Sequence, residues 1–176
     1  MHETHSHLIT LERTQMASVL RDEDLTFLDD APTRQIHIAD LNLPAAQVFD
    51  NLANHPESWP RWFAIVRKCH YEGSPPFGVG TRRRITLRGG ILARETVLAW
   101  DTNTRFAFRV NEINLPGIRA LMEDWTVESL ANRRARVRWV LAADMSKPME
   151  LLFQAGRASI QHVLIKVTQR MESVTD

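Results

Sequence analysis

The apolar residues of this 176-residue chain change their spacing near residue 145. Between about residues 64 and 144 they recur at every second position, in short segments that end at turn residues, which is typical of β-strands. From Pro148 to Met171 they recur every third or fourth position, as on one face of an α-helix. Because the strand-like segments are joined by short turns such as the glycine pair at 89–90, the spacing predicts an antiparallel sheet followed by one long helix.

A further strand and two short helices are predicted before this run. Ile36 and Ile38 alternate with polar residues, as in a strand. Pro44 suits the first turn of a helix, and Pro56 ends that helix. A second helical turn then carries a group of aromatic residues, namely Trp59, Trp62 and Phe63.

These elements predict an α+β fold with a hollow. A curved sheet must bury one face, and the terminal helix must bury its apolar stripe, so the sheet is expected to grip the helix. A strongly curved sheet cannot close its concave face completely around one helix. A cavity between the sheet and the C-terminal helix follows, with the two short helices closing one end.

The charge is distributed unevenly along the chain. Residues 1–33 hold seven acidic and two basic residues, a net charge of −5, while the remaining residues hold 14 acidic and 20 basic residues, a net charge of +6. We therefore predict an acidic N-terminal extension at 1–33 and one folded domain at 34–176. One hypothesis is that the extension lies against a basic face of the sheet, in its own chain or in a second copy of a homodimer.

Several classes of protein are disfavoured by the composition. The longest apolar runs are too short to span a bilayer, and the N-terminus lacks the basic-then-apolar pattern of a signal peptide. The single cysteine, Cys69, cannot form an internal disulfide and is expected to be a packed thiol. A cytoplasmic location is expected.

Four stretches of the chain resemble a known superfamily. They are "IHIADLNLPAAQVFDNLANHPESWPRW" at 36–62, "GVGTRRRITL" at 78–87, "ETVLAWDTNTRFAFRV" at 95–110, and the terminal helix. The chain resembles the SRPBCC superfamily, also called START-like or helix-grip, and within it the bacterial polyketide cyclase/dehydrase-like members. The resemblance covers roughly residues 34–174 and implies the helix-grip fold. The superfamily includes lipid and hormone binders, aromatic cyclases, ring-hydroxylase subunits, chaperone activators and toxins, so it leaves the function open.

The function that we expect is the binding of a small hydrophobic molecule, aromatic or lipid-like, in the internal cavity. Such sites have apolar walls with a few polar groups. We interpret Trp59 as a plug against the first helix rather than as part of the site. The predicted wall residues are Trp62, Phe63, Phe106, Phe108, Trp125, Trp139, Phe153 and Ile160.

The first alternative is an enzyme, a cyclase or dehydratase acting on a polyketide-like substrate. Such an enzyme needs a general acid or base inside the cavity. The candidate groups form no recognisable catalytic motif, and no nucleotide- or cofactor-binding motif is present, so no cofactor is expected. The candidates are Glu95, Tyr71, Arg83, Glu123 and His70.

Glu95 is the candidate that strand alternation favours most. It shares a face with Ala93 and Val97, while Trp100 falls on the opposite face. A buried carboxylate needs a partner, and Arg83 on the neighbouring strand could supply one. An exterior salt bridge is the equally open alternative.

The second alternative is an interaction protein that acts through its Trp-rich end or its basic sheet face. Arg82, Arg84 and Arg88 share one face of a strand, but without a nucleic-acid-binding motif a solvated outer face is the favoured interpretation, and nucleic acid is not expected as a partner. The histidines at positions 2, 5 and 7 could hold a metal ion, although a terminus without a metal site is the favoured interpretation.

Overall fold

The computed structural model describes residues 17–175, with the side chains of residues 17–174. The three N-terminal histidines and about half of the acidic extension lie outside the described residues. No helix of the described residues is both long enough and apolar enough to cross a membrane.

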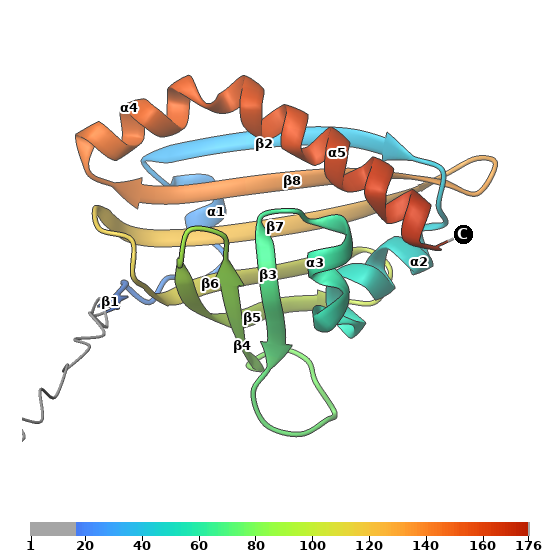
Figure 1. The fold of residues 1–176 in the computed structure, drawn as a ribbon, viewed down its shortest axis with the longest axis horizontal. Coiled ribbons are helices and arrows are strands. Elements are labelled where there is room, and N and C mark those ends of the chain that lie inside the picture. Colours follow the sequence, from blue (N-terminus) through green and yellow to red (C-terminus); the bar gives the residue numbers. More distant parts are fainter. Residues whose placement is uncertain (1–16, 176) are drawn as a thin grey trace, which may run out of the picture.

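One curved antiparallel sheet forms the body of the protein (Figure 1). Its strands follow the order β2-β8-β7-β6-β5-β4-β3, and the short strand β1 pairs with β6. The register between β7 and β8 runs without a shift from Ala120 to Leu130, and Trp125 lies opposite Trp139. The bounds are β1 Ser18–Val19, β2 Thr33–Leu41, β3 Val66–Tyr71, β4 Arg82–Leu87, β5 Leu92–Asp101, β6 Arg105–Ile113, β7 Ile118–Leu130 and β8 Arg134–Met145.

Short helical turns close one end of the sheet, as the Pro-rich sequence predicted. Helix α2 (Ala45–Phe49) continues as a π-helical turn at Asp50–Asn54, and a 3₁₀ turn at Pro56–Ser58 leads into α3 (Trp59–Trp62). Proline at the first helical positions is compatible with these short turns, because the amide that it lacks would have no helical partner there. Figure 1 shows α2 and α3 together at the end where α5 finishes.

The C-terminal helix is two helices rather than the single one that the spacing predicted. Helix α4 (Lys147–Ala155) ends at Gly156, and α5 (Arg157–Thr175) follows. Glycine weakens a helix interior because it loses the most backbone entropy on folding. Of the two, α4 buries no residue, whereas α5 buries Leu164, Val167 and Met171 against the sheet. The gripped element is therefore α5.

A buried polar network fixes this helix pair to the edge strand β2. Gln35 donates a hydrogen bond of 2.8 Å to the carbonyl of Phe153, and the ring of His37 lies 3.2 Å from Gln161 and 3.0 Å from Gln35. Gln161 in turn donates to the carbonyl of Ile38. Gln35 and His37 thus face the helices, because each finds a partner there and satisfies its hydrogen-bonding groups.

Residues 20–31 pack on the outer face of the sheet. Helix α1 (Phe27–Asp30) places Phe27 and Leu28 against buried residues of β7 and β8, on the side opposite α4 and α5 (Figure 1). Asp22 pairs with Arg109 at 3.1 Å, and Asp29 pairs with Arg34 at 3.2 Å. Asp22 and Asp29 thus form ion pairs with arginines other than Arg82, Arg84 and Arg88.

A bulge in β5 corrects the predicted position of Trp100. Strand alternation placed Trp100 on the face opposite Glu95, but the register between β5 and β6 shifts between Val97 and Ala99. A bulge adds one residue to a strand and reverses the faces beyond it. Trp100 consequently pairs with Phe106 and packs edge-on against its ring, at 5.5 Å between centroids, as a half-buried residue at the edge of the core.

The tight turn before β7 should depend on glycine. Gly117 has a φ of +87°, and a Cβ there would lie 2.8 Å from Ser146 Oγ and 3.0 Å from Met149 Cγ. We expect Gly117→Ala to lower the free energy of unfolding by about 2–4 kcal/mol in a guanidinium titration, because strain and overpacking add. Gly90, with a φ of +79° and nothing within 4 Å of a Cβ, is the matched control, and Gly90→Ala should cost only about 1–2 kcal/mol. Equal losses would contradict the close approach.

Candidate functional site

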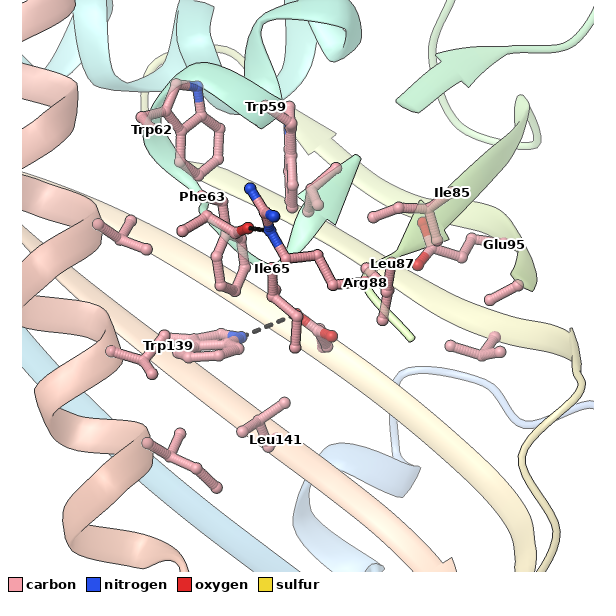
Figure 2. A pocket seen from close by; sticks show the side chains of 18 of the residues that line it. Trp59, Trp62, Phe63, Ile65, Ile85, Leu87, Arg88, Glu95, Trp139 and Leu141 are labelled. Carbon is pink, nitrogen blue, oxygen red and sulfur yellow. Dashed lines mark hydrogen bonds between the residues drawn. The ribbon is translucent and has the colours of Figure 1, made fainter. Parts of the chain in front are cut away.

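A cavity of about 650 Å³ lies between the concave face of the sheet and α5. Strands β4 to β8 supply its floor, α3 and the segment after it close one end, and α5 forms the opposite wall (Figure 2). Most of the lining groups are apolar. The aliphatic lining includes Ile85, Leu87, Val110, Ile113, Leu121 and Leu141.

The structure brings five of the eight predicted wall residues to the cavity. Phe106 and Trp125 are buried in the core but do not line it, and Phe153 packs at the edge of the core on α4. The other five are lining residues: Trp62, Phe63, Phe108, Trp139 and Ile160. The aliphatic residues of the lining were not predicted from the sequence. Strand alternation could have indicated them, because Ile85 and Leu87 share a strand face with Arg83, and Val110 shares one with Phe108.

Trp59 both plugs the end of the sheet and lines the cavity. Its indole nitrogen donates a hydrogen bond of 3.0 Å to the carbonyl of Leu52, which ties α3 to the preceding helical turn. Its ring lies 4.7 Å from that of Trp62 and 6.0 Å from that of Phe63. The breaker-rich segment therefore contributes a fixed aromatic wall, because the proline turns and this hydrogen bond leave the rings little freedom.

Arg83 and Glu95 form a buried ion pair beside this wall. The side chain of Arg83 is fully buried, and both its Nε and Nη2 lie 2.7 Å from Glu95 Oε2. The guanidinium also lies over the rings of Trp59 and Phe108, each at 4.3 Å, which suits a cation whose Nη1 has no hydrogen-bond partner among the described residues. Burial raises the pKa of Glu95, and Arg83 opposes that rise. Glu95 is a lining residue and Arg83 lies behind it.

Glu123 is the second carboxyl group of the cavity. Trp139 donates a hydrogen bond of 2.9 Å to its Oε2, and Trp125 donates one of 3.3 Å to the same atom (Figure 2 shows the bond from Trp139). The two indole rings are stacked at 4.7 Å. Burial, reinforced by the nearby charge of Glu95, raises the pKa of Glu123 to about 7 despite these donors. Near neutral pH this group can therefore either donate or accept a proton inside an apolar site.

The remaining candidates lie away from the cavity. The Tyr71 hydroxyl donates a hydrogen bond of 2.6 Å to the carbonyl of Ala53, and burial raises its pKa, so it is committed to a structural contact. His70 is exposed on the outward side of β3. Burial raises the pKa of Cys69 to about 12, so its thiol is a poor nucleophile at neutral pH. Among residues 17–175, no group of three or more His, Cys, Asp or Glu side chains is arranged to hold a metal ion.

The arrangement of curved sheet, short helices, gripped helix and internal hollow defines the class as START-like. A START superfamily protein from Mycobacterium smegmatis aligns with a TM-score of 0.65 at 9% identity, over 80% of this chain and 98% of that one. The di-domain ARO/CYC BexL from the BE-7585A biosynthetic pathway aligns with a TM-score of 0.67 at 21% identity, over 82% of this chain and 48% of that one. These likenesses concern the fold alone.

Sequence comparison places the chain in a family. Residues 33–172 match the model of the family described as polyketide cyclase / dehydrase and lipid transport, and the chain belongs to that family. Uncharacterized proteins of Mycobacterium tuberculosis and Mycobacterium bovis are each 31% identical over 152 residues, which is 86% of this chain and 90% of theirs. The predicted superfamily and fold class are thereby confirmed.

The buried ion pair should be more sensitive to mutation than an exposed one of equal length. Glu95→Gln leaves the Arg83 charge buried without its counter-ion, and we expect it to lower the free energy of unfolding by about 3–5 kcal/mol. The control Asp40→Asn disrupts an exposed pair of the same 2.7 Å separation, with Arg136, and should cost less than about 1 kcal/mol. The double variant Arg83→Met/Glu95→Leu should recover much of the loss, whereas equal losses in the two single variants would refute the assignment.

Glu123 should make stability fall as the pH rises. Its folded-state pKa of about 7 lies above the ordinary value of 4.5, so between these values the folded protein holds a proton that the unfolded chain has released. We expect Glu123→Gln to gain stability relative to the native protein across this window, by on the order of 2 kcal/mol at neutral pH. Comparing the free energies of unfolding of the two proteins at each pH cancels the contributions of other titrating groups, including His37. A constant difference would contradict the raised pKa.

Proposed function

We propose that the protein binds a small hydrophobic molecule, aromatic or lipid-like, in the cavity between the sheet and α5. The observation that carries the proposal is the hollow of about 650 Å³ with aromatic and aliphatic walls and two carboxyl groups. Small-molecule sites have this range of volume and this mixture of groups. A void of this size lined by packed side chains is a cost to stability that a ligand would remove. The buried free thiol of Cys69 suits a reducing compartment, so we place this binding in the cytoplasm.

Membership of a family described by both cyclization and lipid transport supports binding more directly than catalysis. Both activities require an apolar molecule to enter the fold, whereas only the former requires a proton-transfer group in contact with it.

Binding can be tested with a neutral fluorescent probe, N-phenyl-naphthylamine, whose emission rises in apolar surroundings. Leu121→Trp fills the cavity from β7 and should weaken binding about tenfold or more, since it removes the space that the probe occupies. Leu151→Trp, an equal change at an exposed position of α4 outside the cavity lining, is the control and should leave binding unchanged.

Native mass spectrometry of freshly purified protein provides an independent measurement. A copurified small molecule that is present on the native protein and lost in Leu121→Trp would support the proposal. If no molecule copurifies and the probe binds both tryptophan variants alike, the cavity is not the binding site and the proposal fails.

A second candidate function, a cyclase or dehydratase, is favoured by Glu123 alone. Its pKa of about 7 is suited to moving a proton to or from a substrate carbonyl or enol at neutral pH. A poly-β-ketone thioester surrogate should then yield a ring-closed product, detected by mass spectrometry, with the native protein but not with Glu123→Gln. Ring closure at equal rates with both proteins would exclude this role.

A further inference from the structure

We propose that the ligand is an amphipathic anion whose carboxylate or phosphate group is held at the mouth of the cavity by Arg88, Lys166 and Arg170, with its apolar body inside. The inference rests on the proposed function and specifies the class of ligand. It is carried by the distribution of charge along the cavity.

The basic residues lie together at the open end. His162, Lys166 and Arg170 follow one another at intervals of four on α5, so they share one side of the helix. Arg88 follows the end of β4, and all four residues are exposed and line the cavity. Neighbouring lining residues are also exposed, Ile65 by 45% and Val163 by 39%, which marks this side as the entrance.

Arg88 is held in place at this entrance. Its Nε donates a hydrogen bond of 2.6 Å to the carbonyl of Ala64, and its backbone amide donates one of 2.8 Å to the carbonyl of Ile65. Figure 2 shows its side chain extending from the end of β4 toward Phe63. A guanidinium fixed in this way keeps further N–H groups for an anion and loses little freedom on binding one.

The charges of the mouth are not neutralised within residues 17–175. Arg88, Lys166 and Arg170 have no ion-pair partner among these residues, and the one acidic residue of α5, Glu172, accepts a hydrogen bond from the backbone of Asn42. Some arginines elsewhere on the sheet do pair, for example Arg136 with Asp40. An anionic group would satisfy cations that the described chain leaves unpaired.

The deep end of the cavity carries the opposite kind of group. The acidic lining residues are Glu95 and Glu123, and both lie among the sheet strands rather than at the mouth. Glu95 already has its counter-ion in Arg83. An anion pushed to this depth would meet carboxyl groups and lose its hydration, whereas an apolar group would meet aromatic and aliphatic walls. The cavity therefore selects one orientation, with the apolar body inside and the charge outside.

Matched probes that differ only in the polar group test this directly. Isothermal titration calorimetry would compare dodecanoate with dodecanol, and naphthylacetate with naphthylethanol, each below its aggregation threshold. For at least one tail, the carboxylate should bind about tenfold more tightly than the alcohol, since each partly exposed charge contact adds modestly. Added salt should weaken the carboxylate and leave the alcohol unchanged.

Variants assign the effect to the mouth. The triple variant Arg88→Gln/Lys166→Gln/Arg170→Gln should reduce the preference for the carboxylate over the alcohol by about tenfold. The control, Arg67→Gln/Lys68→Gln/Arg82→Gln, removes three exposed cations that do not line the cavity and should preserve the preference. Lys166→Glu/Arg170→Glu changes only exposed positions of α5 and gives the same readout without disturbing the bonds of Arg88.

The outcomes that would contradict the inference can be told apart. Equal affinities for carboxylate and alcohol, or equal losses in the mouth and control variants, would refute the anionic ligand but leave the binding function standing. Absence of binding by all four probes and by N-phenyl-naphthylamine would refute both. Cosedimentation with phosphatidylglycerol vesicles, without uptake of dissolved dodecanoate, would show that the mouth recognises a membrane surface instead.

Discussion

The architecture of the candidate site depends on a positive charge buried where the sheet meets α3. Arg83 is fully buried on β4, 2.7 Å from Glu95 on β5, and its guanidinium lies 4.3 Å from the ring centroids of both Trp59 and Phe108. A cation out of water is costly unless a counter-ion and polarizable surroundings offset the loss of hydration, and these three residues supply both. Because Trp59 belongs to α3, the same contact fixes the aromatic plug against the sheet.

The cavity follows from that arrangement. With α3 held at one end and α5 fixed along β2 by the Gln35–His37–Gln161 network, the concave face of the sheet is supported on two sides. The space between them cannot collapse without breaking one of these buried polar contacts. Its two carboxyl groups each have a defined partner: Arg83 for Glu95, and the stacked indoles of Trp125 and Trp139 for Glu123.

The consecutive strands from about residue 64 to residue 144 could be predicted because a half-buried antiparallel sheet imposes a period of two on its sequence. The pairing of Arg83 with Glu95 could be suggested for the same reason, since each residue shares a strand face with apolar residues. The prediction for Trp100 was wrong because a bulge adds one residue to β5 without altering its composition. The break at Gly156 was missed because the apolar spacing of three and four continues across it.

Other features depend on contacts between distant segments that no local pattern encodes. Gln35 and His37 face the helices because they form hydrogen bonds with Phe153 and Gln161, which lie more than a hundred positions later in the sequence. Residues 20–31 cover the outer face because Ala120, Met122, Val140 and Ala142 leave an apolar patch on it, and alternation alone gave no reason for both faces of β7 and β8 to be buried. The grouping of Arg88 with α5 at the mouth arises in the same way.

The central claim, that ligand enters this cavity, is tested most directly by methyl NMR of isoleucine- and leucine-labelled protein titrated with naphthylethanol. We expect the largest shifts at Ile85, Leu141 and Ile160, which line the cavity from β4, β8 and α5. The methyl groups of Leu28 and Leu98, which pack on the outer face, should not move. Shifts concentrated on that outer face, or no shifts at all at saturating probe, would contradict the claim.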